Sequence, residues 1–210
     1  MTAAAPRAAR LAETLRTRPG PRRALNVLSI LLLVGGIALF AQPFITNLYA
    51  NWRQSSLQDQ LGSAANRNAY AGGALREGDP VTRLRIPKLG VDTIVVEGTT
   101  LSALRAGSGH YVQTPLPCEP GNSAIAGHRT TYSKPFARTH ELERGDRIVL
   151  DTPVGRCVYR VHDTWVTLPT DATVLAPARG SWLTLTTCDP PGSARERLIV
   201  RAKLVRSTPA

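Results

Sequence analysis

The first long feature of the sequence is an uncharged apolar run over residues 24–41, ALNVLSILLLVGGIALFA. At about 1.5 Å of rise per residue, a helix over this run spans roughly 27 Å, which is close to the hydrocarbon thickness of a bilayer. Residues 43–45 extend the run, so we predict a membrane anchor over residues 24–45. A cleaved signal peptide is the alternative, but the run is longer than the usual ~7 to 15 apolar residues and lacks a good small-x-small cleavage site.

The segment that follows the apolar run, residues 46–80, is polar. Leu48, Trp52, Leu57 and Leu61 form only a partial helical stripe. The pattern therefore predicts a short juxtamembrane helix that frays into a linker.

Alternating or β-branched runs begin near Val81 and recur at intervals near ten residues, which is typical of a β-barrel or sandwich. The first two are joined by a Pro87–Gly90 turn and predict a hairpin. A Gly- and Pro-rich stretch over 107–121 predicts a loop. We expect a mainly β fold, a closed barrel of seven to eight strands with short helices, over residues 81–206, with 207–210 as a tail. The predicted strands are 81–86, 91–97, 122–127, 146–151, 156–166, 181–188 and 197–206.

Composition supports this class of fold. The chain has 210 residues, 42% of them hydrophobic, which suffices for one domain with a core. Glycine (17) and proline (16) are frequent, and this favours turn-rich β structure over a helical bundle.

The formal net charge of +11 would suit a nucleic-acid partner, but the distribution of the charge argues against one. Six arginines crowd residues 1–23, where only Glu13 opposes them and no apolar period exists. We therefore expect a disordered, basic cytoplasmic tail, with the domain after the anchor outside the cell membrane. The remaining positive charge lacks interleaved aromatic residues, so we expect no nucleic acid as partner, and attraction to an anionic cell envelope explains it.

The chain has three cysteines, an odd number for a protein outside the cytoplasm. One hypothesis is a disulfide between Cys118 and Cys157 that leaves Cys188 free. The alternative is that Cys118 and Cys157 are inert, buried thiols, and spacing alone leaves both open. Histidines 110, 128, 140 and 162 fall on separate predicted elements without metal-ligand spacing, so we expect no metal.

Cys188 ends a predicted strand, immediately before the turn-forming residues 189–192. The next strand begins nine residues later at Arg197, so pairing of the two strands places a permanent cation beside the thiol. A nucleophilic cysteine also needs a proton acceptor and a donor to the oxyanion. His128 follows the small-residue strand ending in AIAG and has the best setting among the histidines, while Arg197 suits the oxyanion.

Three stretches of sequence resemble one known family. The chain resembles the sortases, the membrane-anchored cysteine transpeptidases of Gram-positive bacteria. From the N-terminus, the matching stretches are RIPKLGVD at 85–92, AIAGHRTTY at 124–132 and TLTTC at 184–188, and they follow one another in the order found in that family. The match is most similar to the class E sortases of Actinobacteria. That class usually has His-Pro after the cysteine, whereas this chain has Asp189-Pro190.

The resemblance implies an acyl transfer with Cys188 as nucleophile, His128 as general acid and base, and Arg197 as the stabiliser of the oxyanion or substrate. It also implies that no metal and no cofactor takes part in any step. The implied substrates are C-terminal sorting signals of secreted proteins (LAxTG or LPxTG-like, cleaved between Thr and Gly), and the implied acceptor is a cell-wall precursor amine, similar to lipid II. The hydroxyls of Thr186 and Thr187 are candidates for the substrate groove, although strand propensity explains these threonines equally well. The alternatives are a catalytically silent sortase-like binding or pilus-assembly protein, and another envelope cysteine acyltransferase.

Overall fold

The computed structural model describes residues 19–210, with side chains described from Arg22 onward. The chain divides into two units, residues 1–44 and residues 45–210. The tail predicted over residues 1–23 lies mostly outside the described part, because residues 1–18 are not described.

The first helix, α2, spans Pro19–Leu61 and carries the apolar run of the sequence. Its large apolar side chains in the first unit are exposed, with Leu32 at 68% and Phe40 at 74%. The part from Arg22 to Leu61 is long and apolar enough to cross a bilayer by length and composition. This helix is therefore a candidate membrane anchor.

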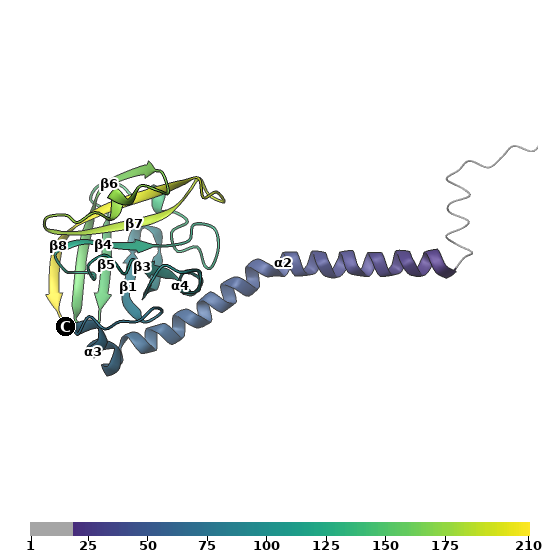
Figure 1. Ribbon diagram of the computed structural model, residues 1–210, viewed down its shortest axis with the longest axis horizontal. Coiled ribbons are helices and arrows are strands. Elements are labelled where there is room, and N and C mark those ends of the chain that lie inside the picture. The colour runs from purple at the N-terminus through teal and green to yellow at the C-terminus, as the bar shows by residue number, and fades with distance from the viewer. Residues whose placement is uncertain (1–18) are drawn as a thin grey trace, which may run out of the picture. The chain divides into compact units, whose positions relative to one another are not determined.

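Eight strands close into a barrel, which confirms the predicted fold class (Figure 1). Around the barrel the strands are ordered β1, β2, β3, β4, β7, β8, β6 and β5, and β5 pairs with β1. The strands are β1 (Pro80–Ile86), β2 (Val91–Glu97), β3 (Ser108–His110), β4 (Gly121–Ala126), β5 (Arg147–Thr152), β6 (Gly155–Thr167), β7 (Ser181–Asp189) and β8 (Glu196–Pro209). The short helices are α3 (Ala64–Ala71), η1 (Pro87–Leu89), α4 (Leu101–Ala106), η2 (Thr139–Glu141) and η3 (Ala172–Leu175).

The barrel interior is filled by alternate residues of the strands. Leu84, Ile125, Leu183 and Leu185 are at most 1% exposed and share one core cluster. Shifting any of these strands by one residue would turn its apolar side chains outward, so the core fixes the register of the barrel.

Strand β3 and the end of β8 differ from the prediction. The pattern predicted a loop over 107–121, because three residues that include a glycine carry no alternation. Ser108–His110 is a strand because it pairs in parallel with β2 and antiparallel with β4, and both pairings are non-local. Strand β8 also continues to Pro209, opposite Gly155, where we expected a short tail.

The segment after the anchor is more ordered than its polar pattern indicates. Helix α2 continues to Leu61, and its Gln54 amide bonds to the strand and helix beside it. The Gln54 Nε2 atom donates to Ile94 O (3.1 Å) and Ala106 O (2.7 Å), while Oε1 accepts from Ile94 N (2.5 Å) and from Thr93 Oγ1 (3.1 Å). A half-buried, fully bonded amide ties this end of α2 to β2.

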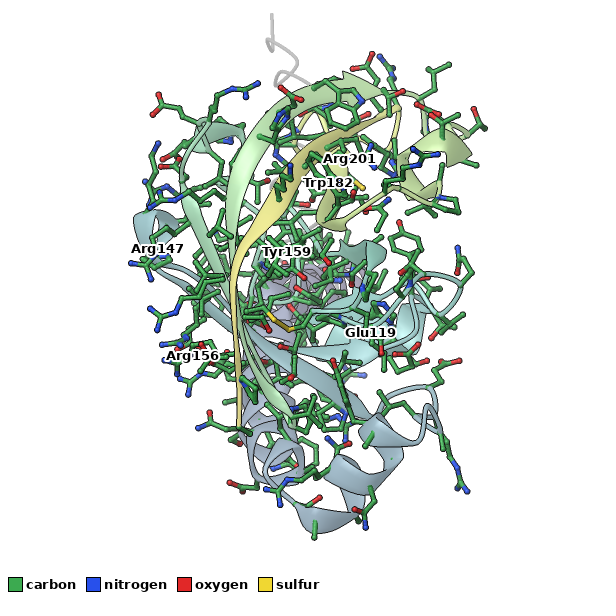
Figure 2. All side chains as sticks on the ribbon, turned by 90° about the vertical axis from the view of Figure 1, so that its left-hand side faces the viewer. Glu119, Arg147, Arg156, Tyr159, Trp182 and Arg201 are labelled. Carbon is green, nitrogen blue, oxygen red and sulfur yellow. A yellow bond between two sulfur atoms is a disulfide. The ribbon has the colours of Figure 1, made fainter. Side chains whose placement is uncertain are left out.

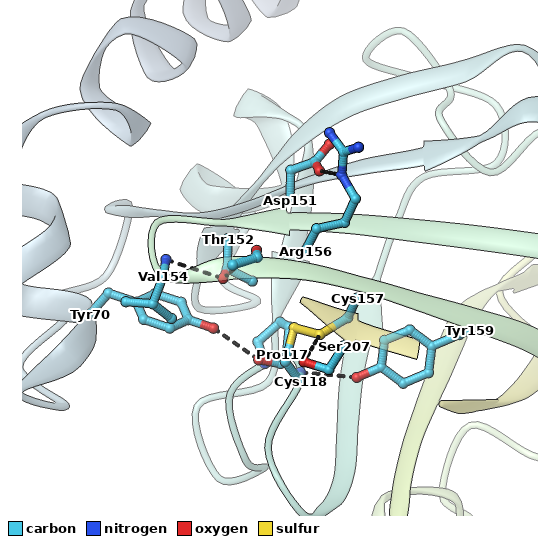
Figure 3. Close-up of a disulfide and its surroundings, with 11 residues drawn as sticks. Tyr70, Pro117, Cys118, Asp151, Thr152, Val154, Arg156, Cys157, Tyr159 and Ser207 are labelled. Carbon is cyan, nitrogen blue, oxygen red and sulfur yellow. Dashed lines mark hydrogen bonds and ion pairs between the residues drawn. A yellow bond between two sulfur atoms is a disulfide. The ribbon is translucent and has the colours of Figure 1, made fainter. Parts of the chain in front are cut away.

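A disulfide joins Cys118 to Cys157, with their Cα atoms 5.8 Å apart (Figure 3). It fixes the loop before β4 onto β6. The Cys118 amide donates to the Tyr159 hydroxyl (2.9 Å), and burial raises the pKa of Tyr159 to about 12. The loop is held from the other side by Tyr70 of α3, whose hydroxyl donates to Pro117 O (2.9 Å).

Positive charge on the outside of the barrel is partly paired. Asp151 contacts both Arg85 and Arg156, and Figure 2 shows Arg156 and Arg147 on the outer side of the barrel. Trp182 of β7 lies under Arg201, whose guanidinium carbon is 5.4 Å from the ring centre. Exposed pairs of this kind contribute only about 0 to 1 kcal/mol each, so the core and the disulfide dominate the stability.

We predict that Gln54→Ala lowers the free energy of unfolding by about 1 to 3 kcal/mol, because it leaves the Ile94 N–H and the Ala106 carbonyl without a side-chain partner. Gln60→Ala is the matched control, because Gln60 is exposed on the same helix and its side-chain amide donates to Ser56 Oγ, which is also exposed to solvent in part. Urea unfolding of the full chain measures both. Equal losses in the two variants would contradict the role of Gln54.

We also predict that replacing both Cys118 and Cys157 by alanine lowers the free energy of unfolding by roughly 4 kcal/mol. The physical reason is the sequence separation of 39 residues, since the unfolded chain without the crosslink regains the entropy of that loop. Chemical denaturation of the double variant checks the value, and no change in midpoint would refute it.

Candidate active site

Strands β4 and β7 are parallel neighbours and end at the same rim of the barrel. Their register pairs Ala126 with Thr186, and the ladder continues because the Gly127 amide donates to Thr186 O (3.1 Å). His128 is the second residue after the end of β4, and Cys188 occupies the corresponding place near the end of β7. Residues sixty positions apart in the sequence therefore meet at one rim.

The hydroxyls of Thr186 and Thr187 are engaged by the protein itself. Thr187 Oγ1 donates to Gly127 O (2.8 Å), and Thr186 Oγ1 lies 3.1 Å from the Tyr111 hydroxyl. Both threonines are only 4% exposed. Their hydroxyls join neighbouring segments of the rim.

Cys188 is the free cysteine of the chain and is half-buried. Antiparallel pairing of β7 with β8 places Arg197 directly opposite Cys188. The Arg197 guanidinium donates to Ala194 O (3.1 Å) and Glu196 O (3.0 Å), which are carbonyls of its own turn. Among the described residues, none of the ion pairs involves Arg197, so its charge is not neutralised by a carboxylate.

His128 lies half-buried at the rim, against an aromatic ring. The centre of its imidazole is 5.3 Å from the centre of the Tyr132 ring, and the two planes are tilted by 37°. Burial lowers the pKa of His128 below its usual value near 6.5. The neutral imidazole, which accepts a proton, is therefore the favoured form at neutral pH.

The backbone before His128 passes close to a buried ring. A side chain at Gly127 would place its Cβ 2.5 Å from the Phe136 ring, and Phe136 itself is fully buried. The Phe136 amide donates to His128 O (3.1 Å), so the loop folds back over its own start. Glycine at 127 is required by this close approach, and it fixes where His128 leaves the strand.

The loop between His128 and Phe136 is supported from α2. Tyr132, Ser133 and Lys134 all have φ in the left-handed region (49°, 59° and 39°), which is costly for residues other than glycine. Ser133 N donates to Asn47 Oδ1 (2.9 Å), and Ser133 Oγ donates to Asn51 Oδ1 (3.1 Å). Two asparagines of one helix thus hold the turn whose first residue packs on His128.

Sequence reasoning assigned no role to Arg129 and left Asp189 unexplained. The structure brings them together: Arg129 forms an ion pair with the Asp189 carboxylate, and its Nη1 donates to Cys188 O (3.1 Å). These residues follow His128 and Cys188 with the same sixty-residue offset, and only the parallel register, which is not readable from the sequence, shows that they meet.

Two of the other histidines make contacts away from the rim, and His140 is exposed. His110 is 1% exposed, with Nδ1 3.0 Å from Glu97 Oε2 and Nε2 3.0 Å from Pro115 O. His162 contacts Asp163 and packs edge-on against Trp182. Within residues 19–210, no group of three or more His, Cys, Asp or Glu residues is arranged to hold a metal ion.

The fold and the site together define a small β-barrel protein with a free thiol, an imidazole and a guanidinium at one rim. A family model of the Sortase domain matches residues 84–205. The chain belongs to the sortase family.

Individual relatives agree with this assignment. Sortase SrtE1 of Streptomyces coelicolor is 34% identical over 176 residues, covering 76% of this chain and 49% of the relative, so the chain spans about half the length of that protein. The structure of a Sortase D5 transpeptidase from Clostridium perfringens is 29% identical with a TM-score of 0.66, over 75% of this chain and 99% of that one. Sortase E1 from Streptomyces coelicolor, solved with a tripeptide in the active site, is 35% identical with a TM-score of 0.59, over 63% and 91%.

The lowered pKa of His128 predicts a pH dependence of stability. As the pH falls below about 6.5, the unfolded chain takes up a proton on this residue that the folded protein binds less readily, so the free energy of unfolding decreases until the pH passes below the folded pKa. His128→Asn removes this contribution. We expect the variant to lose less stability than the wild type between about pH 7 and pH 5, measured by urea unfolding.

The control is His140→Asn, which removes an imidazole from an exposed position after the same loop. It should leave the acid-side loss of stability in place. Parallel stability profiles for the wild type and His128→Asn would contradict the prediction.

Proposed function

We propose that the protein is a membrane-anchored cysteine transpeptidase. It cleaves a C-terminal sorting signal of secreted proteins, LAxTG or LPxTG-like, between Thr and Gly. It then transfers the acyl group to an amine of a cell-wall precursor. The observation that carries the proposal is the direct pairing of the free thiol of Cys188 with Arg197, at the rim where His128 follows the parallel strand.

In the first half of the reaction, the Cys188 thiolate attacks the carbonyl carbon of the substrate threonine. The carbonyl oxygen becomes an oxyanion, and the Arg197 guanidinium, whose charge no carboxylate in the described structure neutralises, donates to it. The C–N bond to glycine then breaks and leaves a thioester between the threonine and Cys188.

His128 accounts for the protons. Its neutral form, favoured by burial, accepts the proton of the Cys188 thiol, and the resulting imidazolium protonates the departing glycine amine. In the second half, the neutral imidazole takes a proton from the incoming amine as it attacks the thioester. The thiol is regenerated when the C–S bond breaks and the sulfur regains that proton.

The membrane side of the proposal rests on α2 and the charges before it. The apolar part of α2 is a candidate anchor, and arginines at 16, 18, 22 and 23 precede it. Because basic flanks stay in the cytoplasm, we place the N-terminus there and the barrel outside, single-pass. The barrel then faces the secreted proteins and the lipid II-like precursor amines on which it acts. The tripeptide in the active site of sortase E1 from Streptomyces coelicolor supports a peptide as substrate.

We predict that the purified full chain in detergent micelles cleaves a fluorogenic LAxTG or LPxTG peptide in the presence of an amine, and that Cys188→Ala abolishes cleavage. Removing the proton carrier in His128→Ala should lower kcat/KM by about 10² to 10⁴. Removing the oxyanion donor in Arg197→Ala should lower kcat by about 10² to 10³. Mass spectrometry of the denatured enzyme detects the thioester.

Arg195→Ala is the matched control for Arg197, because Arg195 lies exposed in the same turn without facing Cys188. Its activity should stay close to that of the wild type. If the wild type cleaves neither peptide faster than Cys188→Ala does, the enzymatic proposal fails. Binding of the peptide without cleavage would then identify a catalytically silent scaffold.

A further inference from the structure

Arg129 is a buried cation that links the two segments of the rim. Only 5% of its side chain is exposed, against 21% for its ion-pair partner Asp189. Its Nη1 atom donates hydrogen bonds to the Asp189 carboxylate and to the carbonyl of Cys188. Its Nε atom is buried and has no hydrogen-bond partner in the described structure. The guanidinium is therefore held through its contacts with residues 188 and 189.

The charges around Cys188 explain why such a contact matters. Strand β8 presents Arg197 opposite the thiol and Glu196 opposite Asp189, and Arg195 lies in the connecting turn. Asp189 is thus a carboxylate adjacent to the thiol in sequence and faces a second carboxylate across the ladder. The loop after β4 supplies the remaining groups, His128 and Arg129.

An unpaired carboxylate at 189 would harm the site in two ways. Negative charge next to a thiol disfavours the thiolate, which is the reactive form. A free carboxylate in this turn would also compete for the Arg197 guanidinium, because carboxylates are the preferred partners of arginine. The ion pair with Arg129 engages Asp189 on the side of the β4 loop, and Arg197 forms no ion pair with any carboxylate of residues 22–210.

We propose that Arg129 and Asp189 form a positioning pair for the reactive centre. Arg129 holds the carbonyl of Cys188 at a fixed place beside the loop that carries His128, and it neutralises Asp189 so that the thiol and Arg197 remain available to each other. The expected effect of the pair on peptide cleavage rests on the proposed function, whereas its expected effect on the thiol does not. The reactivity of the thiol itself is measurable without any sorting substrate.

The test uses the full chain with Arg129→Met, Asp189→Asn and the two combined, and measures the rate of Cys188 alkylation by iodoacetamide at neutral pH. Alkylation reports on this residue alone, because the other two cysteines are joined in a disulfide. We expect Arg129→Met to slow alkylation by about tenfold, and the double variant to recover a substantial part of that loss, since the carboxylate is gone. Peptide cleavage should follow the same order, with the loss in kcat rather than in KM.

The matched control is the exposed pair Arg138 and Glu141, which lies after the same loop and should tolerate Arg138→Met without a change in alkylation. Thermal unfolding of each variant separates folding from reactivity. Arg129→Lys keeps the positive charge, so Cys188 should be alkylated faster in this variant than in Arg129→Met. If Arg129→Met does not fold, Arg129→Lys is compared with the wild type instead.

Unchanged alkylation in folded Arg129→Met, or a double variant as slow as Arg129→Met, would overturn the positioning role and leave an ordinary structural ion pair. A wild type that alkylates readily but cleaves no sorting peptide would refute the proposed function, while the alkylation rates would still decide the role of the pair.

Discussion

The parallel ladder between β4 and β7 is the constraint on which the rim depends. It joins segments sixty residues apart, and no local turn could bring them together, because parallel strands require a long crossover. Once Ala126 lies beside Thr186, the residues that follow these two positions are adjacent whatever their identity. Strand β8 then returns from the turn after β7 and adds Arg197. The thiol and the guanidinium thus come from two paired strands of the sheet, and the imidazole comes from the start of the loop that follows β4.

That ladder is held in register by the core beneath it. Leu183 and Leu185 of β7 point into the barrel, whereas Thr186 and Cys188 belong to the opposite set of alternating residues. A slip of one residue would take the leucines out of the core and put threonines in their place, so the free-energy cost of a slip protects the geometry of the rim. Mobility of the rim is restricted further by the Thr187 hydroxyl, which bonds to Gly127 O. The alternation of side chains along β7 therefore determines both the packing of the core and the position of Cys188 at the rim.

The sequence was sufficient for features that depend on local pattern. Seven strands, the β1–β2 hairpin and the Cys188–Arg197 pairing follow from alternation and short turns, since nearby strands have few ways to pair. It was insufficient where partners are distant. Strand β3 exists only through non-local pairing, the Gln54 amide of a polar helix gives no periodic pattern, and the Arg129–Asp189 pair requires the β4–β7 register. Each of these three features is stabilised by a partner that lies far away in the sequence, so the residues around it do not predict it.

The same distinction applies to the support of His128. Its loop contains three successive left-handed residues without a glycine, a conformation that is maintained only if outside contacts outweigh its cost. Asn47 and Asn51 provide such contacts through Ser133, and both belong to α2, the helix that also carries the candidate anchor. Residues 45–61 therefore act as part of the barrel domain rather than as a spacer. A barrel that begins after this segment would keep its thiol and guanidinium but lose the contacts that hold the Tyr132 turn against the imidazole.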